Sequence, residues 1–144
     1  MNQTQQPADG YELDAGGVRT LDAAECWRIL AAESLGRLAV RVDDGVDVFP
    51  VNFLVHDGAV FFRSAPGAKL VELTREPRVA FEVDGQYAHR AWSVVVRGVA
   101  TRIGSEDEIW EAGVTQLHTW HPSDKFNYVR IQPASVSGRS FEKK

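Results

Sequence analysis

The chain has 144 residues, of which 44% are hydrophobic and 25% are charged, and its net charge is −4. This length fits one domain with a hydrophobic core, and the acidic balance disfavours a nucleic-acid-binding surface, which is normally basic. The single cysteine, Cys26, excludes an intramolecular disulfide and a multi-thiolate zinc site. We find no apolar run long enough to cross a membrane and no signal peptide, so the sequence predicts a cytoplasmic protein that binds neither nucleic acid nor membrane.

The N-terminal part of the chain predicts a tail, a helix and a strand. Residues 1–20 are polar and are expected to form a mobile tail or an arm laid over a partner subunit. Asp22 and Glu25 have the spacing of a helix-capping box, and Gly36 is the expected end of the helix that follows. Residues 38–42 alternate between apolar and polar side chains, as a half-buried strand does.

The stretch from residue 46 to residue 63 predicts a hairpin at the centre of the fold. Residues 46–55 are apolar on both alternating faces, which suits a strand that is buried on both sides. Asp57-Gly58 is the signal of a two-residue hairpin turn. Residues 59–63 return as the partner strand.

A candidate phosphate site follows this hairpin. Ser64 followed by Pro66 predicts the start of a helix, with Lys69 about one turn inside it. Backbone donors, the helix dipole and the side chains of Arg63, Ser64 and Lys69 would then converge on one spot, which favours an anionic phosphate. From the residues alone, solvated surface charges and a capping serine explain the same pattern.

The rest of the chain predicts further strands and one helix. These elements are a strand at 79–83, a loop at 85–90, a strand at 91–103, a helix that starts at 105–108, and strands at 126–131 and 135–141 separated by Pro133. Gly98 marks a bulge, or a close approach by a ligand or another chain, and Trp110 is expected on the buried face of the helix. Antiparallel strands punctuated by short helices predict one mainly β domain, residues 21–144, folded as a barrel rather than a parallel sheet.

Four short motifs occur in a characteristic order. They are Pro50-Val51-Asn52-Phe53, then Phe62-Arg63-Ser64 with Gly67-Ala68-Lys69-Leu70, then Glu76-Pro77-Arg78-Val79, and finally Trp92-Ser93-Val94-Val95-Val96-Arg97-Gly98. In this order and spacing they resemble the pyridoxamine 5'-phosphate oxidase-like family, over roughly residues 21–141. The resemblance implies a split β-barrel, an antiparallel Greek-key-like barrel that binds FMN. It also implies a homodimer with the cofactor at the subunit interface.

The resemblance implies cofactor contacts from four places in the chain. They are the ring strand Pro50, Val51, Asn52 and Phe53, the phosphate cluster Arg63, Ser64, Gly67 and Lys69, the strand start at Trp92 and Ser93, and Arg139 in the last strand. In the family's oxidases an arginine of the ring strand helps to hold phosphate, and Pro50 stands at that position here, so Arg63 is the expected substitute. The family's substrate-binding tryptophan has no counterpart between Ser135 and Gly138, which disfavours a vitamin B6 phosphate as substrate.

We therefore expect an FMN-dependent oxidoreductase that acts on an unidentified small organic molecule. Two alternatives stay open, because one fold hosts several functions. The first is a deazaflavin-dependent reductase with the same fold, and the second is a non-catalytic protein that stores or senses flavin or haem. No residue stands out as an essential acid or base, and the four histidines are expected to be structural or surface residues rather than metal ligands.

Overall fold

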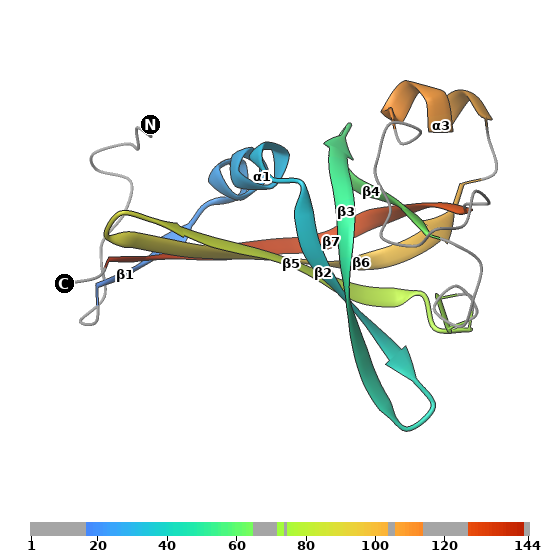
Figure 1. The fold of residues 1–144 in the computed structure, drawn as a ribbon, viewed down its shortest axis with the longest axis horizontal. Coiled ribbons are helices and arrows are strands. Elements are labelled where there is room, and N and C mark those ends of the chain that lie inside the picture. Colours follow the sequence, from blue (N-terminus) through green and yellow to red (C-terminus); the bar gives the residue numbers. More distant parts are fainter. Residues whose placement is uncertain (1–16, 65–71, 74, 104–105, 114–126, 143–144) are drawn as a thin grey trace.

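The computed structural model describes residues 17–64, 72–73, 75–103, 106–113 and 127–142 (Figure 1). Within them lie seven strands and two helices. In chain order they are β1 (Val18–Leu21), α1 (Ala23–Ala32), β2 (Leu35–Val42), β3 (Gly45–His56), β4 (Ala59–Ser64), β5 (Arg78–Tyr87), β6 (Arg90–Arg102), α3 (Glu106–Ala112) and β7 (Asn127–Glu142).

The strands form one antiparallel sheet that closes on itself. Its order is β1-β7-β4-β3-β2-β5-β6, and β6 also pairs with β7, so the strands from β2 to β7 make a ring. β7 pairs with β6 along one side, and on its other side with β4 and then with β1. This arrangement confirms the predicted mainly β barrel.

The inner face of the ring is the main hydrophobic core. The rings of Phe53 and Phe81 meet edge to face there, with centroids 4.8 Å apart. Other fully buried side chains are those of Leu38, Val40, Val60, Phe62, Val83, Val94, Val96 and Ile131. A second, smaller cluster lies outside the ring, where α3 covers Phe61 of β4. Alternate residues of the strands therefore face a closed core and an outer surface.

α1 is fixed by its N-terminal residues. The backbone N–H of Glu25 donates to Asp22 Oδ1 at 2.8 Å, and the Asp22 N–H donates to Glu25 Oε1 at 3.0 Å, which confirms the predicted capping box. Glu25 Oε2 also accepts a hydrogen bond from the buried Arg19 of β1 at 2.8 Å. The helix buries Cys26 and Leu30, and burial, followed by the charges of Asp22 and Glu25, raises the pKa of Cys26 to about 11. The thiol is therefore protonated at neutral pH.

Two glycines that were predicted to interrupt the chain lie inside strands. Gly36 is in β2, and β5 runs through Gly85, so the predicted helix stop and the predicted loop at 85–90 are wrong. A Cβ atom at Gly36 would lie 2.3 Å from the ring of Phe81, and one at Gly85 would lie 2.6 Å from the ring of Trp92. Both glycines make room for aromatic rings of the core.

The two strands predicted at 126–131 and 135–141 are one strand, β7. Pro133 does not end it, because it lies at a register shift opposite Gly98 of β6. The predicted bulge at Gly98 is confirmed, and the backbone that approaches it is that of β7 in the same chain: a Cβ atom at Gly98 would lie 2.2 Å from the carbonyl oxygen of Gln132.

Three apolar side chains that were expected to be buried are exposed. Val46 and Val48 are 62% and 60% exposed, so residues 46–55 are not buried on both faces along their whole length. The reason is that the end of the β2–β3 hairpin projects beyond the ring (Figure 1). Trp110 is 73% exposed, since α3 faces the sheet through Ile109 instead.

Some predictions fall partly outside the described residues. These are the helix start after Ser64 and the helix cap at 105–108. Residues 18–20, which the sequence placed in the tail, belong to β1, because they pair with β7. Among the described helices, none is both long and apolar enough to cross a membrane.

Candidate functional site

β3 and β4 separate beyond Phe53 and Phe62. The two strands pair from the turn at Asp57 up to Phe53 and Phe62, and the described pairing of β3 then continues with β2 alone. β4 continues along β7 instead. Extending the β3–β4 register by one residue places Asn52 across from Arg63. We call this pair, at the point where the strands part, the β3–β4 mouth.

The predicted ring strand and phosphate cluster have side chains on both faces of the sheet. The outward side chains are those of Pro50, Asn52 and Arg63, and the buried inward ones are those of Val51, Phe53 and Ser64. For a ligand on the outer face, only the backbone groups of the inward residues are available. The remaining members of the cluster, Gly67 and Lys69, lie outside the described residues.

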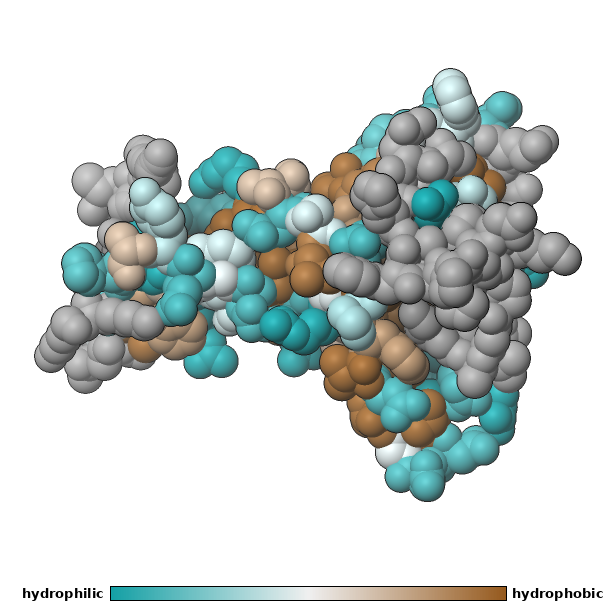
Figure 2. Space-filling view, viewed as in Figure 1, coloured by the Kyte–Doolittle hydropathy of each residue, from teal (hydrophilic) through white to brown (hydrophobic). Residues whose placement is uncertain are grey.

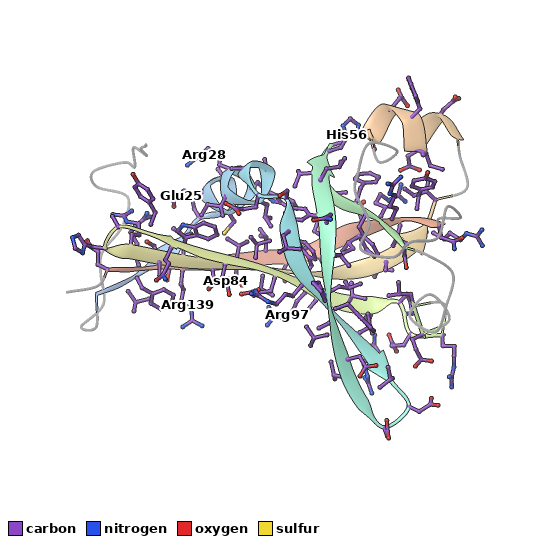
Figure 3. All side chains as sticks on the ribbon, viewed as in Figure 1. Glu25, Arg28, His56, Asp84, Arg97 and Arg139 are labelled. Carbon is purple, nitrogen blue, oxygen red and sulfur yellow. The ribbon has the colours of Figure 1, made fainter. Side chains whose placement is uncertain are left out.

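The other predicted cofactor residues lie on β6 and β7. Ser93 stands opposite Arg139, so both side chains are on the outer face. Figure 3 shows Arg139 on the same side of the long strands as Asp84 and Arg97. Trp92 faces inward instead and packs against the main core.

The β3–β4 mouth and the Ser93–Arg139 pair lie at opposite sides of the outer face. One row of directly paired residues crosses five strands between them: Pro50, Arg37, Glu82, Val95 and Ser137. Four strand spacings correspond to roughly 19 Å. Asn52, Ser93 and Arg139 each lie two residues from this row in the same direction, so Arg139 is about 19 Å from Asn52 along the sheet, and Ser93, on β6, is three spacings or roughly 14 Å away. The sheet therefore does not bring all the predicted cofactor residues of one chain together.

An ionic cluster that the sequence analysis missed lies between the two groups. Arg37 donates to Glu82 at 2.7 Å and to Asp84 at 3.2 Å. Burial and the neighbouring Asp84 carboxyl raise the pKa of Glu82, and Arg37 opposes this shift. Charges at alternate positions of predicted strands were visible in the sequence, but the pairing of β2 with β5 was not.

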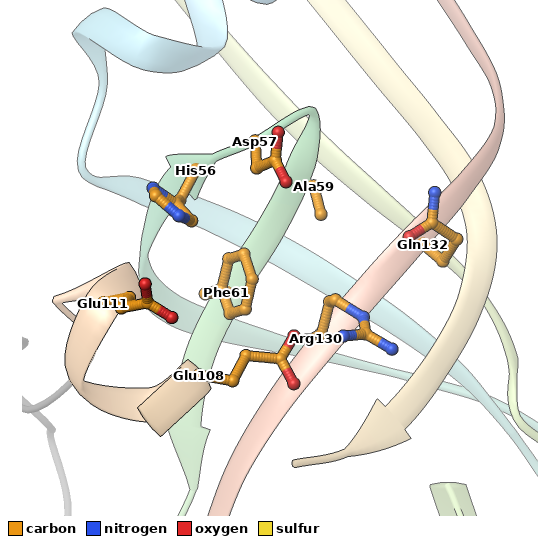
Figure 4. Close-up of a pocket in the computed structure, with 8 residues that line it drawn as sticks. All are labelled: His56, Asp57, Ala59, Phe61, Glu108, Glu111, Arg130 and Gln132. Atoms are coloured by element: carbon orange, nitrogen blue, oxygen red, sulfur yellow. Dashed lines mark hydrogen bonds and ion pairs between the residues drawn. The ribbon is translucent and has the colours of Figure 1, made fainter. Parts of the chain in front are cut away.

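A cavity of about 190 Å³ lies elsewhere, between α3 and the β3–β4 turn (Figure 4). Its lining consists of His56, Asp57, Ala59, Phe61, Glu108, Glu111, Arg130 and Gln132. Glu108 forms an ion pair with Arg130, which leaves Asp57 and Glu111 as additional carboxylates. The cavity contains none of the residues predicted to bind the cofactor, and its excess of carboxylates is unfavourable for a phosphate.

Three solved structures are similar to this chain over most of its length. A protein of Corynebacterium glutamicum described as a candidate pyridoxamine 5'-phosphate oxidase is 43% identical, with a TM-score of 0.78, and the match covers 87% of this chain and 98% of that one. The FAD binding protein of Mycobacterium smegmatis is 38% identical (TM-score 0.73, coverage 87% and 99%). An FAD-binding protein of Mesorhizobium loti is 32% identical (TM-score 0.77, coverage 85% and 96%).

A family model agrees with these structures. The model described as pyridoxamine 5'-phosphate oxidase matches residues 22–140, which include both the β3–β4 mouth and the Ser93–Arg139 pair. The closed antiparallel sheet described above fits the split barrel that the motifs implied. This chain belongs to the pyridoxamine 5'-phosphate oxidase-like family of split β-barrel proteins.

Proposed function

We propose that this protein binds a flavin nucleotide at the β3–β4 mouth and acts as an oxidoreductase on a small organic molecule. The observation that carries the proposal is the placement of Asn52 and Arg63 on the outer face where β3 and β4 part, within the region matched by the family. Two relatives at 38% and 32% identity are named as FAD-binding proteins, which supports a flavin as the ligand.

The side chains at the mouth suit the two polar parts of a flavin nucleotide. The guanidinium of Arg63, together with Lys69, would form charge-assisted hydrogen bonds to the phosphate. The amide of Asn52 both donates and accepts, as the polar edge of a flavin ring requires. Val51 and Phe53 hold this part of β3 in place through their buried side chains. A bound flavin supplies the redox chemistry, and the protein orients it and excludes water.

The site suits either FMN or FAD. The resemblance in the motifs predicts FMN, whereas the two named relatives point to FAD. The flavin ring and the first phosphate are common to both nucleotides, so Asn52 and Arg63 do not distinguish them. Heating the purified protein and separating the released cofactor by chromatography would identify the nucleotide.

The same proposal includes a homodimer with the cofactor at the subunit interface. Leu35, Val46 and Val48 are 47–62% exposed on the β2–β3 hairpin, and Figure 2 shows apolar side chains on this projecting part. Exposed apolar surface of this kind is typical of an interface. A second copy would also bring its own Ser93 and Arg139 to a flavin nucleotide at the mouth, since in one chain they lie three and four strand spacings from β3, roughly 14 and 19 Å.

The test combines a spectrum with binding measurements. A flavin, a deazaflavin and a haem have different visible spectra, so the spectrum of the purified protein decides among them. For Arg63→Ala and Lys69→Ala, we expect FMN to bind about 10- to 100-fold more weakly in fluorescence quenching, because each loses a charge-assisted bond. Riboflavin, which lacks the phosphate, should be nearly unaffected. Arg28→Ala, an exposed arginine on α1, is the matched control. Equal losses for FMN and riboflavin would remove Arg63 and Lys69 from the phosphate site.

Catalysis requires a separate measurement. We expect the bound flavin to be reduced by a nicotinamide or a deazaflavin donor and reoxidised by an organic acceptor. A flavin that binds tightly but turns over with no donor in a broad panel would favour a storage or sensing function.

A further inference from the structure

Two arginines on the outer face of β6 and β7 have no ion-pair partner among the described residues. Arg97 and Arg139 are both exposed and lie on the same side of the long strands (Figure 3). Glu82 and Asp84, on the outer face of the neighbouring strand β5, are both bonded to Arg37. With Arg37, three arginines share this part of the sheet with two carboxylates, which leaves an excess of one positive charge.

Hydroxyl groups accompany these arginines. Ser135 stands opposite Arg97, and Ser93 stands opposite Arg139, with Ser137 in the row between. Residues that are directly opposite in an antiparallel pair share a face, so the three hydroxyls lie on the outer surface between the two guanidinium groups. Arg139 is four residues from Ser135, which corresponds to roughly 14 Å along β7. We call these five residues the Arg97–Arg139 patch.

The backbone under Arg97 is held at a fixed place. The register of β6 and β7 shifts between Arg97 and Gly98, and β7 approaches so closely there that no Cβ atom fits at Gly98. A β-bulge redirects the neighbouring side chain and is over-represented next to active sites. The β-bulge between β6 and β7 therefore fixes the position of the Arg97 backbone.

We propose that Arg97, with the Ser135 hydroxyl opposite it, binds the second phosphate of a flavin adenine dinucleotide whose flavin half occupies the β3–β4 mouth of the partner subunit, with Arg139 and Ser93, at the other end of the patch, nearer to the flavin half. The proposal rests on the proposed function. Guanidinium and hydroxyl groups both donate hydrogen bonds to phosphate oxygens, and a guanidinium group can bind phosphate through two parallel hydrogen bonds, a bidentate geometry. The patch makes this protein selective for the dinucleotide, because FMN has no second phosphate.

The test compares FAD with FMN. We expect Arg97→Gln to weaken FAD binding about tenfold or more in fluorescence quenching, because one charged hydrogen bond is lost, and to leave FMN binding unchanged. Arg97→Lys keeps the charge but cannot form the bidentate contact, so its FAD affinity should lie between those of the wild type and Arg97→Gln. Arg28→Gln is the matched control, and light scattering follows the oligomeric state of each variant.

Each other outcome overturns the proposal in a recognisable way. An unchanged FAD affinity, or an equal loss for FAD and FMN, removes Arg97 from a second-phosphate site while flavin binding itself stands. Dissociation of the dimer by Arg97→Gln shows that the arginine contacts protein rather than phosphate. A wild-type protein that binds neither FAD nor FMN refutes the proposed function as well.

Discussion

The inner and outer faces of the ring are built from the same strands but differ in how closely their side chains are packed. On the inner face, atoms pack so closely that no side chain fits at Gly36, which lies against the ring of Phe81, or at Gly98, which lies against the backbone of β7. On the outer face, Val46 and Val48 are about 60% exposed, and Arg97 has no ion-pair partner among the described residues.

The inner-face residues therefore determine the stability of the fold, whereas the outer-face residues are available for binding. Tight packing costs free energy when a single atom is added or removed. Exposed charges and valines contribute little to the stability of one chain. We therefore expect substitutions inside to lower the free energy of unfolding, and substitutions outside to change association or binding.

The largest effect is expected at the buried ion pair between β1 and α1. Arg19→Met leaves the Glu25 carboxylate buried without its guanidinium partner, and the free energy of unfolding should fall by about 3–5 kcal/mol in urea denaturation. Adding Glu25→Gln to Arg19→Met should restore most of this loss, because glutamine keeps the acceptor of the capping box. A double variant as unstable as Arg19→Met alone would show that the charge is not the cause.

The close contact of β6 with β7 should give the next largest effect. Gly98→Ala places a Cβ atom 2.2 Å from the carbonyl oxygen of Gln132, a backbone atom that cannot rotate away. We expect the free energy of unfolding to fall by about 2–3 kcal/mol in urea denaturation. Gly45→Ala is the matched control, because nothing lies within 4 Å of an added Cβ atom there. A similar loss in both variants would contradict the packing explanation.

Outer-face valines should matter for association instead. Val46→Asp places a charge on the projecting hairpin, and we expect the dissociation constant of the proposed dimer to rise at least about thirtyfold, measured by light scattering over a dilution series. The unfolding of the separated chain should change by less than about 0.5 kcal/mol. Tyr87→Ser, at an 84% exposed position in the β5–β6 hairpin, is the control. A dimer that is unaffected by Val46→Asp would exclude the hairpin from the interface.

The fold was predictable wherever local chemistry determined it. The capping box at Asp22 and the Asp57-Gly58 turn follow from neighbouring residues, and both are confirmed. Gly36 and Gly85 were interpreted as breaks because glycine also ends helices and forms loops. Their actual role depends on rings that pack over them from distant strands, and no local pattern contains this information.

The site was predictable only in part. The motifs identified the family, because a resemblance preserves the order of residues along the chain. They did not give the separation of the β3–β4 mouth from Arg139, which depends on the strand order β3-β2-β5-β6-β7. The proposed role of Arg97 was not visible in the sequence for the same reason, since the binding of Glu82 and Asp84 by Arg37 depends on the pairing of β2 with β5.

The smallest effect is expected at an exposed ion pair next to β5. Hydrogen bonds from the side chain and then the backbone of Arg78 lower the pKa of Glu76 to about 2. Because the folded pKa is below the unfolded one, this pair stabilises the protein above the ordinary pKa of 4.5, and the contribution is lost as the pH falls towards 2. Arg78→Ala keeps the backbone N–H, so an NMR titration should show the pKa of Glu76 rising most of the way towards 4.5. High salt should raise it in the wild type in the same direction. A Glu76 pKa that stays near 2 in Arg78→Ala would mean that the guanidinium is not the main cause of the low pKa. The free energy of unfolding of Arg78→Ala at neutral pH should hardly differ from that of the wild type, as expected for an exposed charge pair.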